Sequence, residues 1–123
     1  MGELQSFELT REDIADGVSV LALRGETDRP CQKAVCAAIE AARRDGRDVI
    51  VDLTAASHLD SPMVATLVAA TEQGRRRGES VVVVCASERV RRSLQLKGLE
   101  PILPIARTRE GAIELIAGRA PRS

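Results

Sequence analysis

The fold can be read outward from residues 48–70, DVIVDLTAASHLDSPMVATLVAA. This stretch opens with Val49–Leu53, a short apolar run rich in β-branched residues, which is typical of a strand covered on both faces. It closes with apolar residues at helical spacing, which predict an amphipathic helix. Between the two segments, Asp60, Ser61 and Pro62 interrupt the apolar pattern in immediate succession. The chain therefore ends a buried strand and starts a helix within a few residues.

The rest of the chain continues this alternation of strands and helices. Strands are predicted at Gln5–Leu9, Val18–Leu23, Val81–Cys85 and Ile102–Ile105, with a hairpin turn at Asp16-Gly17 between the first two. Helices are predicted from an N-cap at Asp28 to Gly46, from Ser61 to Gly78, from Ser87 to Lys97 and from Thr108 to Gly118. The order ββαβαβαβα predicts a single α/β domain, a mostly parallel sheet with an N-terminal antiparallel hairpin strand and helices packed against it.

The composition limits the function classes. A chain of 123 residues is expected to form one domain, here residues 1–118, followed by a frayed tail at residues 119–123. Its 18 basic and 18 acidic residues balance, so no net field attracts nucleic acid or an anionic membrane. Phe7 is the only aromatic residue, which argues against a base-stacking surface for single strands.

The cysteines and the chain start indicate the compartment. Cys31, Cys36 and Cys85 are odd in number and form no CxxC pair, so we expect reduced thiols rather than disulfides or a zinc site. Neither a signal peptide nor an apolar run of about 20 residues is present. We therefore expect a cytoplasmic protein without membrane insertion, metal or cofactor.

The interruption at Asp60, Ser61 and Pro62 has a structural and a functional interpretation. Structurally, Ser61 is expected to be the N-cap of the helix, with Pro62 in the first helical position, where a missing N–H costs nothing. Functionally, the carboxyl ends of parallel strands form the working edge of open α/β sheets. A hydroxyl there faces the start of a helix, which suits an added phosphate.

Three segments together give a resemblance to a known family. They are VSVLALRGETD at residues 18–28, residues 48–70, and RRRGESVVVVCASERVRRSLQLKGLEPILPI at residues 75–105. The chain resembles STAS domains of the anti-sigma factor antagonist type along essentially its whole length. The resemblance implies partner switching: the domain binds an anti-sigma factor with a serine-kinase fold of the histidine-kinase ATPase type, and a sigma factor is released.

The resemblance also implies roles for particular residues. By position, Ser61 matches the hydroxyl that the kinase phosphorylates to block binding and that a serine phosphatase restores. Asp60 precedes it, and Asp28 would contribute to the same partner surface from a neighbouring strand end. Pro62 and Met63 stand where the family usually has a small residue and glycine, so binding is expected more firmly than phosphorylation.

Further partner contacts are expected at Pro62 and on the helix after Ser61, where Met63, Thr66 and Ala70 are predicted to be exposed. We expect no catalysis, because the acids Asp28, Asp52 and Asp60 have no companion base. His58 is the only histidine and is expected to be a loop residue. Two alternatives stay open: a STAS subunit of a lipid-transport ABC complex or stressosome-like assembly, and, far less favoured, a hydrolase using Asp60 and Ser61.

Overall fold

The computed structural model describes residues 7–14, 17–26, 29–56, 59–96 and 103–118. These residues form the strands β1 (Phe7–Ile14), β2 (Val18–Gly25), β3 (Asp48–Ala56), β4 (Val81–Val84) and β5 (Ile105–Ala106). They also form the helices α1 (Arg29–Arg44), α2 (Ser61–Arg76), α3 (Glu88–Leu96) and α4 (Arg109–Ala117). The order of elements is the one that the sequence predicts.

One mixed sheet organises the domain. Its strands follow the order β1-β2-β3-β4-β5, with β1 antiparallel to β2 and every other neighbouring pair parallel. Ile14 and Val18 are paired at the end of the hairpin, and Gly17 between them has φ +71°, a conformation that glycine adopts without strain. The predicted α/β architecture with an N-terminal hairpin is therefore confirmed.

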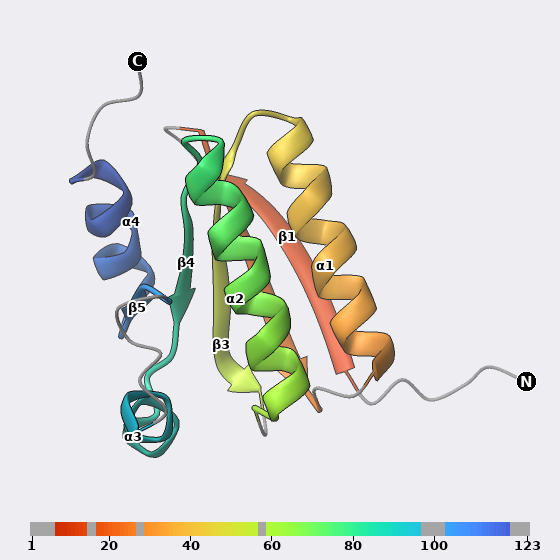
Figure 1. Ribbon diagram of the computed structural model, residues 1–123, viewed down its shortest axis with the longest axis vertical. Coiled ribbons are helices and arrows are strands. Elements are labelled where there is room, and N and C mark those ends of the chain that lie inside the picture. The colour runs from red at the N-terminus through yellow and green to blue at the C-terminus, as the bar shows by residue number, and fades with distance from the viewer. Residues whose placement is uncertain (1–6, 15–16, 27–28, 57–58, 97–102, 119–123) are drawn as a thin grey trace, which may run out of the picture.

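Helices cover both faces of the sheet, as Figure 1 shows. On one face α1 and α2 lie side by side, and α4 packs on the other face beside β4 and β5. Along β4, Val81 and Val83 belong to the core under α1 and α2, whereas Val82 and Val84 belong to the core under α4. Both faces of this strand are buried, which explains why its sequence is continuously apolar.

The two outer strands differ from the prediction in their bounds. β1 continues past the predicted end at Leu9 to Ile14, because its polar second half keeps pairing with β2, while the predicted residues 5 and 6 lie outside the described residues. β5 is Ile105–Ala106 instead of residues 102–105. Pro104 lies just before β5, and its carbonyl oxygen accepts a hydrogen bond from Val83 N at 2.9 Å. Proline has no N–H to donate, so Pro104 contributes only an acceptor to this edge of the sheet and β5 begins at the next residue, Ile105.

The helix starts after β4 and β5 follow the prediction. Ser87 Oγ accepts a hydrogen bond from the N–H of Val90 at 3.3 Å, and Thr108 Oγ1 accepts one from Gly111 at 2.9 Å. Both hydroxyls therefore satisfy an N–H group that the first helical turn leaves free. Among the described residues, no helix is both long enough and apolar enough to cross a bilayer.

Candidate functional site at the start of helix α2

The carboxyl ends of β2 and β3 meet at one edge of the sheet. Gly25, the last residue of β2, is paired with Ala56, the last residue of β3. Gly25 has φ +98°, which a residue with a side chain rarely adopts, so the end of β2 favours glycine at this position. Figure 1 shows that α2 begins beside the end of β3. We call the residues Asp60, Ser61 and Pro62 at this edge the α2 start.

Asp60 is the N-cap of α2. Its backbone is extended (φ −91°, ψ 169°), and its Oδ1 accepts a hydrogen bond from Met63 N at 3.0 Å. Its carbonyl oxygen accepts the first intrahelical bond from Val64 N, also at 3.0 Å. The prediction that Ser61 caps the helix is therefore wrong. The carboxylate of Asp60 reaches the free N–H three residues on, so Ser61 is already helical and Pro62 is the second helical residue.

Ser61 lies exposed at the first position of α2, and Pro62 beside it is exposed as well. The side chain of Ser61 is not needed for capping, since Asp60 performs that role. The start of a helix carries about half a unit of positive charge from the aligned peptide dipoles. A phosphoryl group on Ser61 would therefore meet favourable electrostatics without any change in the cap.

The predicted exposure of Met63 and Ala70 is wrong. Met63 is 0% exposed and Ala70 is 9% exposed, because both belong to the face of α2 that packs on the sheet and on α1. The buried residues of α2 are Met63, Val64, Leu67, Ala70, Thr71 and Gly74. Met63 therefore packs in the core beneath the first turn of α2, and its side chain is not accessible to a partner in this conformation.

Thr66 is half-buried on the next turn of α2. Its Oγ1 donates a hydrogen bond to the carbonyl oxygen of Pro62 at 3.0 Å. The part of Thr66 that remains accessible adjoins the α2 start, as the prediction requires of a partner contact. Asp28 and His58, the other residues singled out from the sequence, lie outside the described residues.

Asp52, the other acid considered from the sequence, serves the opposite face of the sheet. Its Oδ2 accepts a hydrogen bond from Arg109 Nε of α4 at 2.8 Å, and its Oδ1 accepts one from Thr54 N at 2.9 Å. Burial raises the pKa of Asp52, but these hydrogen bonds outweigh burial and hold the pKa below its ordinary value. Asp52 therefore stabilises the contact with α4, while Asp60 caps α2.

The described residues contain no group of three or more His, Cys, Asp and Glu side chains arranged to hold a metal ion. Of the cysteines, Cys31 and Cys85 are buried and Cys36 is exposed on α1. The chemistry that the α2 start offers is that of an accessible hydroxyl beside a helix N-terminus and a carboxylate.

Sequence reasoning missed the burial of Arg43 on α1. Its side chain is only 4% exposed, and its Nε donates a hydrogen bond to Glu79 Oε1 at 2.7 Å. A signal was present, because the buried positions Cys31, Val35 and Ile39 follow each other at a spacing of four and Arg43 is the next in that series. The apolar stripe of α1 thus predicts that Arg43 points inward.

Comparisons with known proteins agree with this architecture. The family model described as the STAS domain matches residues 11–112. The crystal structure of an anti-sigma factor antagonist from Mycobacterium paratuberculosis is 31% identical, with a TM-score of 0.78 over 91% of this chain and 95% of that chain. No curated protein matches the chain.

Two structures of the anti-sigma factor antagonist SpoIIAA share the fold. The unphosphorylated form is 24% identical, with a TM-score of 0.72 over 93% of this chain and 100% of that chain. The phosphorylated form, described as a Bacillus cell fate determinant, is 23% identical, with a TM-score of 0.67 over 89% and 99%. At such identities the likeness concerns the fold. Together with the family match and the mycobacterial relative, it identifies the chain as a member of the STAS domain family, of the anti-sigma factor antagonist type.

Proposed function

We propose that this chain binds an anti-sigma factor through the α2 start and thereby releases a sigma factor, and that phosphorylation of Ser61 switches the binding off. The surface comprises Asp60, Ser61 and Pro62 and the accessible part of Thr66, and the family resemblance implies that Asp28, which lies outside the described residues, contributes to it. The 31% identity to a mycobacterial anti-sigma factor antagonist over nearly the whole chain supports this function.

The observation that carries the proposal is the exposed position of Ser61 directly after an intact N-cap. A kinase can reach the hydroxyl without unfolding the helix, because neither the cap nor the core depends on the Ser61 side chain. Phosphorylation adds about −1.5 to −2 charges beside the carboxylate of Asp60. Like charges placed at an interface cost several kcal/mol, so a partner with an acidic or closely fitting surface would be released.

The partner we infer is an anti-sigma factor with a serine-kinase fold of the histidine-kinase ATPase type, acting in the cytoplasm. It would both bind the unmodified domain and phosphorylate Ser61, and a serine phosphatase would restore the hydroxyl. The chain itself acts as a binding protein in this scheme. Asp52 and Asp60 are engaged in hydrogen bonds to Arg109 and to the helix backbone, which suits structural acids rather than an acid–base pair.

Affinity capture from a native lysate tests the proposal with a matched pair of variants. Ser61→Ala keeps the surface neutral and removes the acceptor, so it should retain the anti-sigma factor. Ser61→Asp places a permanent charge at the same position and should weaken binding at least about tenfold, a difference of about 1.4 kcal/mol. Equal binding by both variants would contradict the switch, and recovery of transporter subunits instead of an anti-sigma factor would contradict the function.

A further inference from the structure

A groove runs between α1 and α2, from Thr66, one turn after the α2 start, toward the carboxyl ends of the helices. Its volume is about 440 Å³, which falls in the range of roughly 300–1,000 Å³ that is usual for small-molecule sites. Ile39, Ala69, Ala70 and Cys36 supply apolar lining, and Arg29 and Lys33 of α1 lie toward one end. The groove therefore combines an apolar wall with positive charge.

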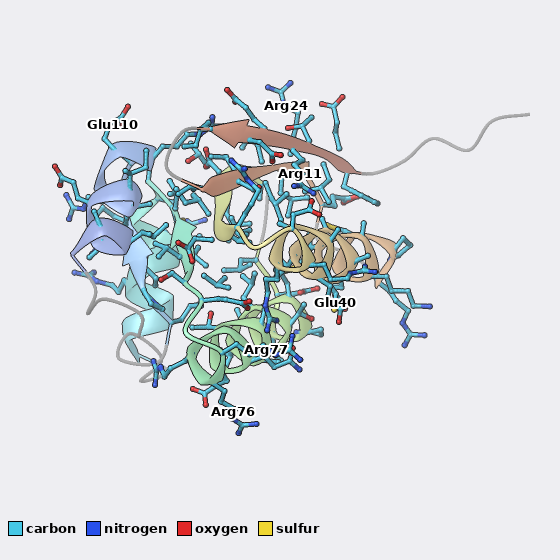
Figure 2. The ribbon with its side chains drawn as sticks, turned by 90° about the horizontal axis from the view of Figure 1, so that it is seen from above. Arg11, Arg24, Glu40, Arg76, Arg77 and Glu110 are labelled. Atoms are coloured by element: carbon cyan, nitrogen blue, oxygen red, sulfur yellow. The ribbon has the colours of Figure 1, made fainter. Side chains whose placement is uncertain are left out.

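A second, smaller hollow continues the groove toward the carboxyl ends of both helices. Its volume is about 210 Å³, and it is lined by Glu40, Arg43, Arg44, Gln73 and Arg77. Glu40, Arg43 and Gln73 line both hollows, so Arg43 lies where the two meet. Figure 2 shows Glu40 and Arg77 between α1 and α2, whereas Arg76 points away. Five basic residues line the two hollows against the single acid Glu40.

Arg43 carries a donor that the fold leaves without an acceptor. Its Nε is bonded to Glu79 at 2.7 Å, and its Nη1 donates to Gln73 Oε1 over a long 3.3 Å. Within the part of the chain that the structure describes, Nη2 has no hydrogen-bond partner, although it is buried. Buried donors without an acceptor are uncommon and unfavourable in folded proteins. The guanidinium thus has a donor left for one more anionic or carbonyl oxygen, which a shift of the neighbouring side chains would have to admit.

We propose that this groove binds an amphipathic carboxylate of the fatty-acid class. The hydrocarbon chain lies along Ile39, Ala69 and Ala70, and the carboxylate pairs with Arg43 by displacing the exposed Gln73 side chain. A guanidinium and a carboxylate match in charge and geometry, which favours a carboxylate over an alcohol or a cation. The groove shares Thr66 with the proposed partner surface but does not include Asp60, Ser61 or Pro62, so octanoate binding and capture of the anti-sigma factor test the two proposals separately.

Cys36 provides a direct readout, since it lines the groove and is exposed while the other two thiols are buried. The test measures the rate at which iodoacetamide alkylates Cys36, by mass spectrometry, with octanoate as the probe and its Kd taken from calorimetry. At a free octanoate concentration of ten times the Kd, about one tenth of the protein molecules have an empty groove. Alkylation of Cys36 should therefore be about tenfold slower. Octan-1-ol and acetate at the same concentration should leave the rate unchanged.

Two variants with the same substitution locate the effect. Ala69→Phe fills the groove and should abolish the protection, whereas Ala37→Phe, at an exposed α1 position outside the groove lining, should keep it. Lys33→Glu, which tests the charge without adding bulk, should weaken octanoate about threefold. The proposal is overturned if octanoate does not protect Cys36, if octan-1-ol protects equally well, or if both phenylalanine variants behave alike.

Discussion

Replacing Asp60 by alanine removes the cap of α2 and nothing else from the core. The loss is one hydrogen bond, from Met63 N to Asp60 Oδ1 at 3.0 Å. N-cap substitutions of this kind cost about 0.5–2 kcal/mol, and typically about 1 kcal/mol. For a small domain with an m-value of about 1–3 kcal/mol per molar urea, the unfolding midpoint should fall by about 0.3–1 M.

Asp60→Asn is the matched control, because asparagine caps a helix about as well as aspartate but carries no charge. Urea titration followed by far-ultraviolet circular dichroism gives both midpoints under the same conditions. We expect Asp60→Asn to stay close to the wild-type midpoint and Asp60→Ala to fall below it. If the two variants lose the same stability, charge rather than the hydrogen bond matters at this position. If neither loses any, Asp60 is not the cap.

Three further outcomes follow from buried contacts and can be measured by the same urea titration. Met63→Ala should lower the free energy of unfolding by about 2–5 kcal/mol, because Met63 is 0% exposed and its truncation leaves a cavity. A loss below about 1 kcal/mol would indicate that Met63 is exposed in solution. Glu79→Ala should cost roughly 3 kcal/mol, because it leaves the buried Arg43 without its ion-pair partner; a neutral result would show that the pair is solvated. Arg109→Gln should lower the free energy of unfolding by its full amount at pH 7 and by progressively less below about pH 4. The ionised Asp52 stabilises the fold through this pair above its unfolded pKa of about 3.9, and this contribution is lost as the carboxylate is protonated at lower pH. An equal loss of stability at pH 7 and pH 3 would contradict the pairing.

The arrangement of the sheet was predictable because the apolar patterns are strong. Val81–Val84 of β4 and Val49–Val51 of β3 are apolar on both faces, and the structure buries them between two helical layers. Strand ends were less predictable. The second half of β1 is polar and pairs with β2 mainly through its backbone, with one side-chain hydrogen bond from Ser19 Oγ to Asp13 Oδ1 at 2.7 Å. The pairing of such an exposed edge strand leaves little trace in side-chain type.

The α2 start shows where sequence patterns mislead. Ser61 and Asp60 are both good N-caps, and Pro62 favoured Ser61 because proline is common at the first helical position. The decision rests on which oxygen reaches a free N–H, a geometric fact that composition does not contain. Met63 was misassigned for a related reason. Its face on α2 depends on the helix phase, and the structure shows that the buried stripe includes Met63 and Ala70.

Arg43 illustrates a third limit. Charged side chains are rarely buried, so the default expectation for an arginine at the end of a helix is exposure. Its position in the α1 stripe was a signal that sequence reasoning did not use, and the partner Glu79 lies 36 residues away in the sequence. Contacts of this range require the folded arrangement.

The central claim is that the Ser61 hydroxyl is the accessible switch on a partner-binding edge. Its most direct test is to incubate the wild-type domain and Ser61→Ala with the anti-sigma kinase and ATP, and to map any phosphate by tandem mass spectrometry. Ser87, another exposed serine at a helix start, serves as the internal control. We predict one phosphate per wild-type chain, on Ser61, none on Ser87, and none on the variant. An unmodified wild-type chain, or phosphate on another hydroxyl, would contradict the account.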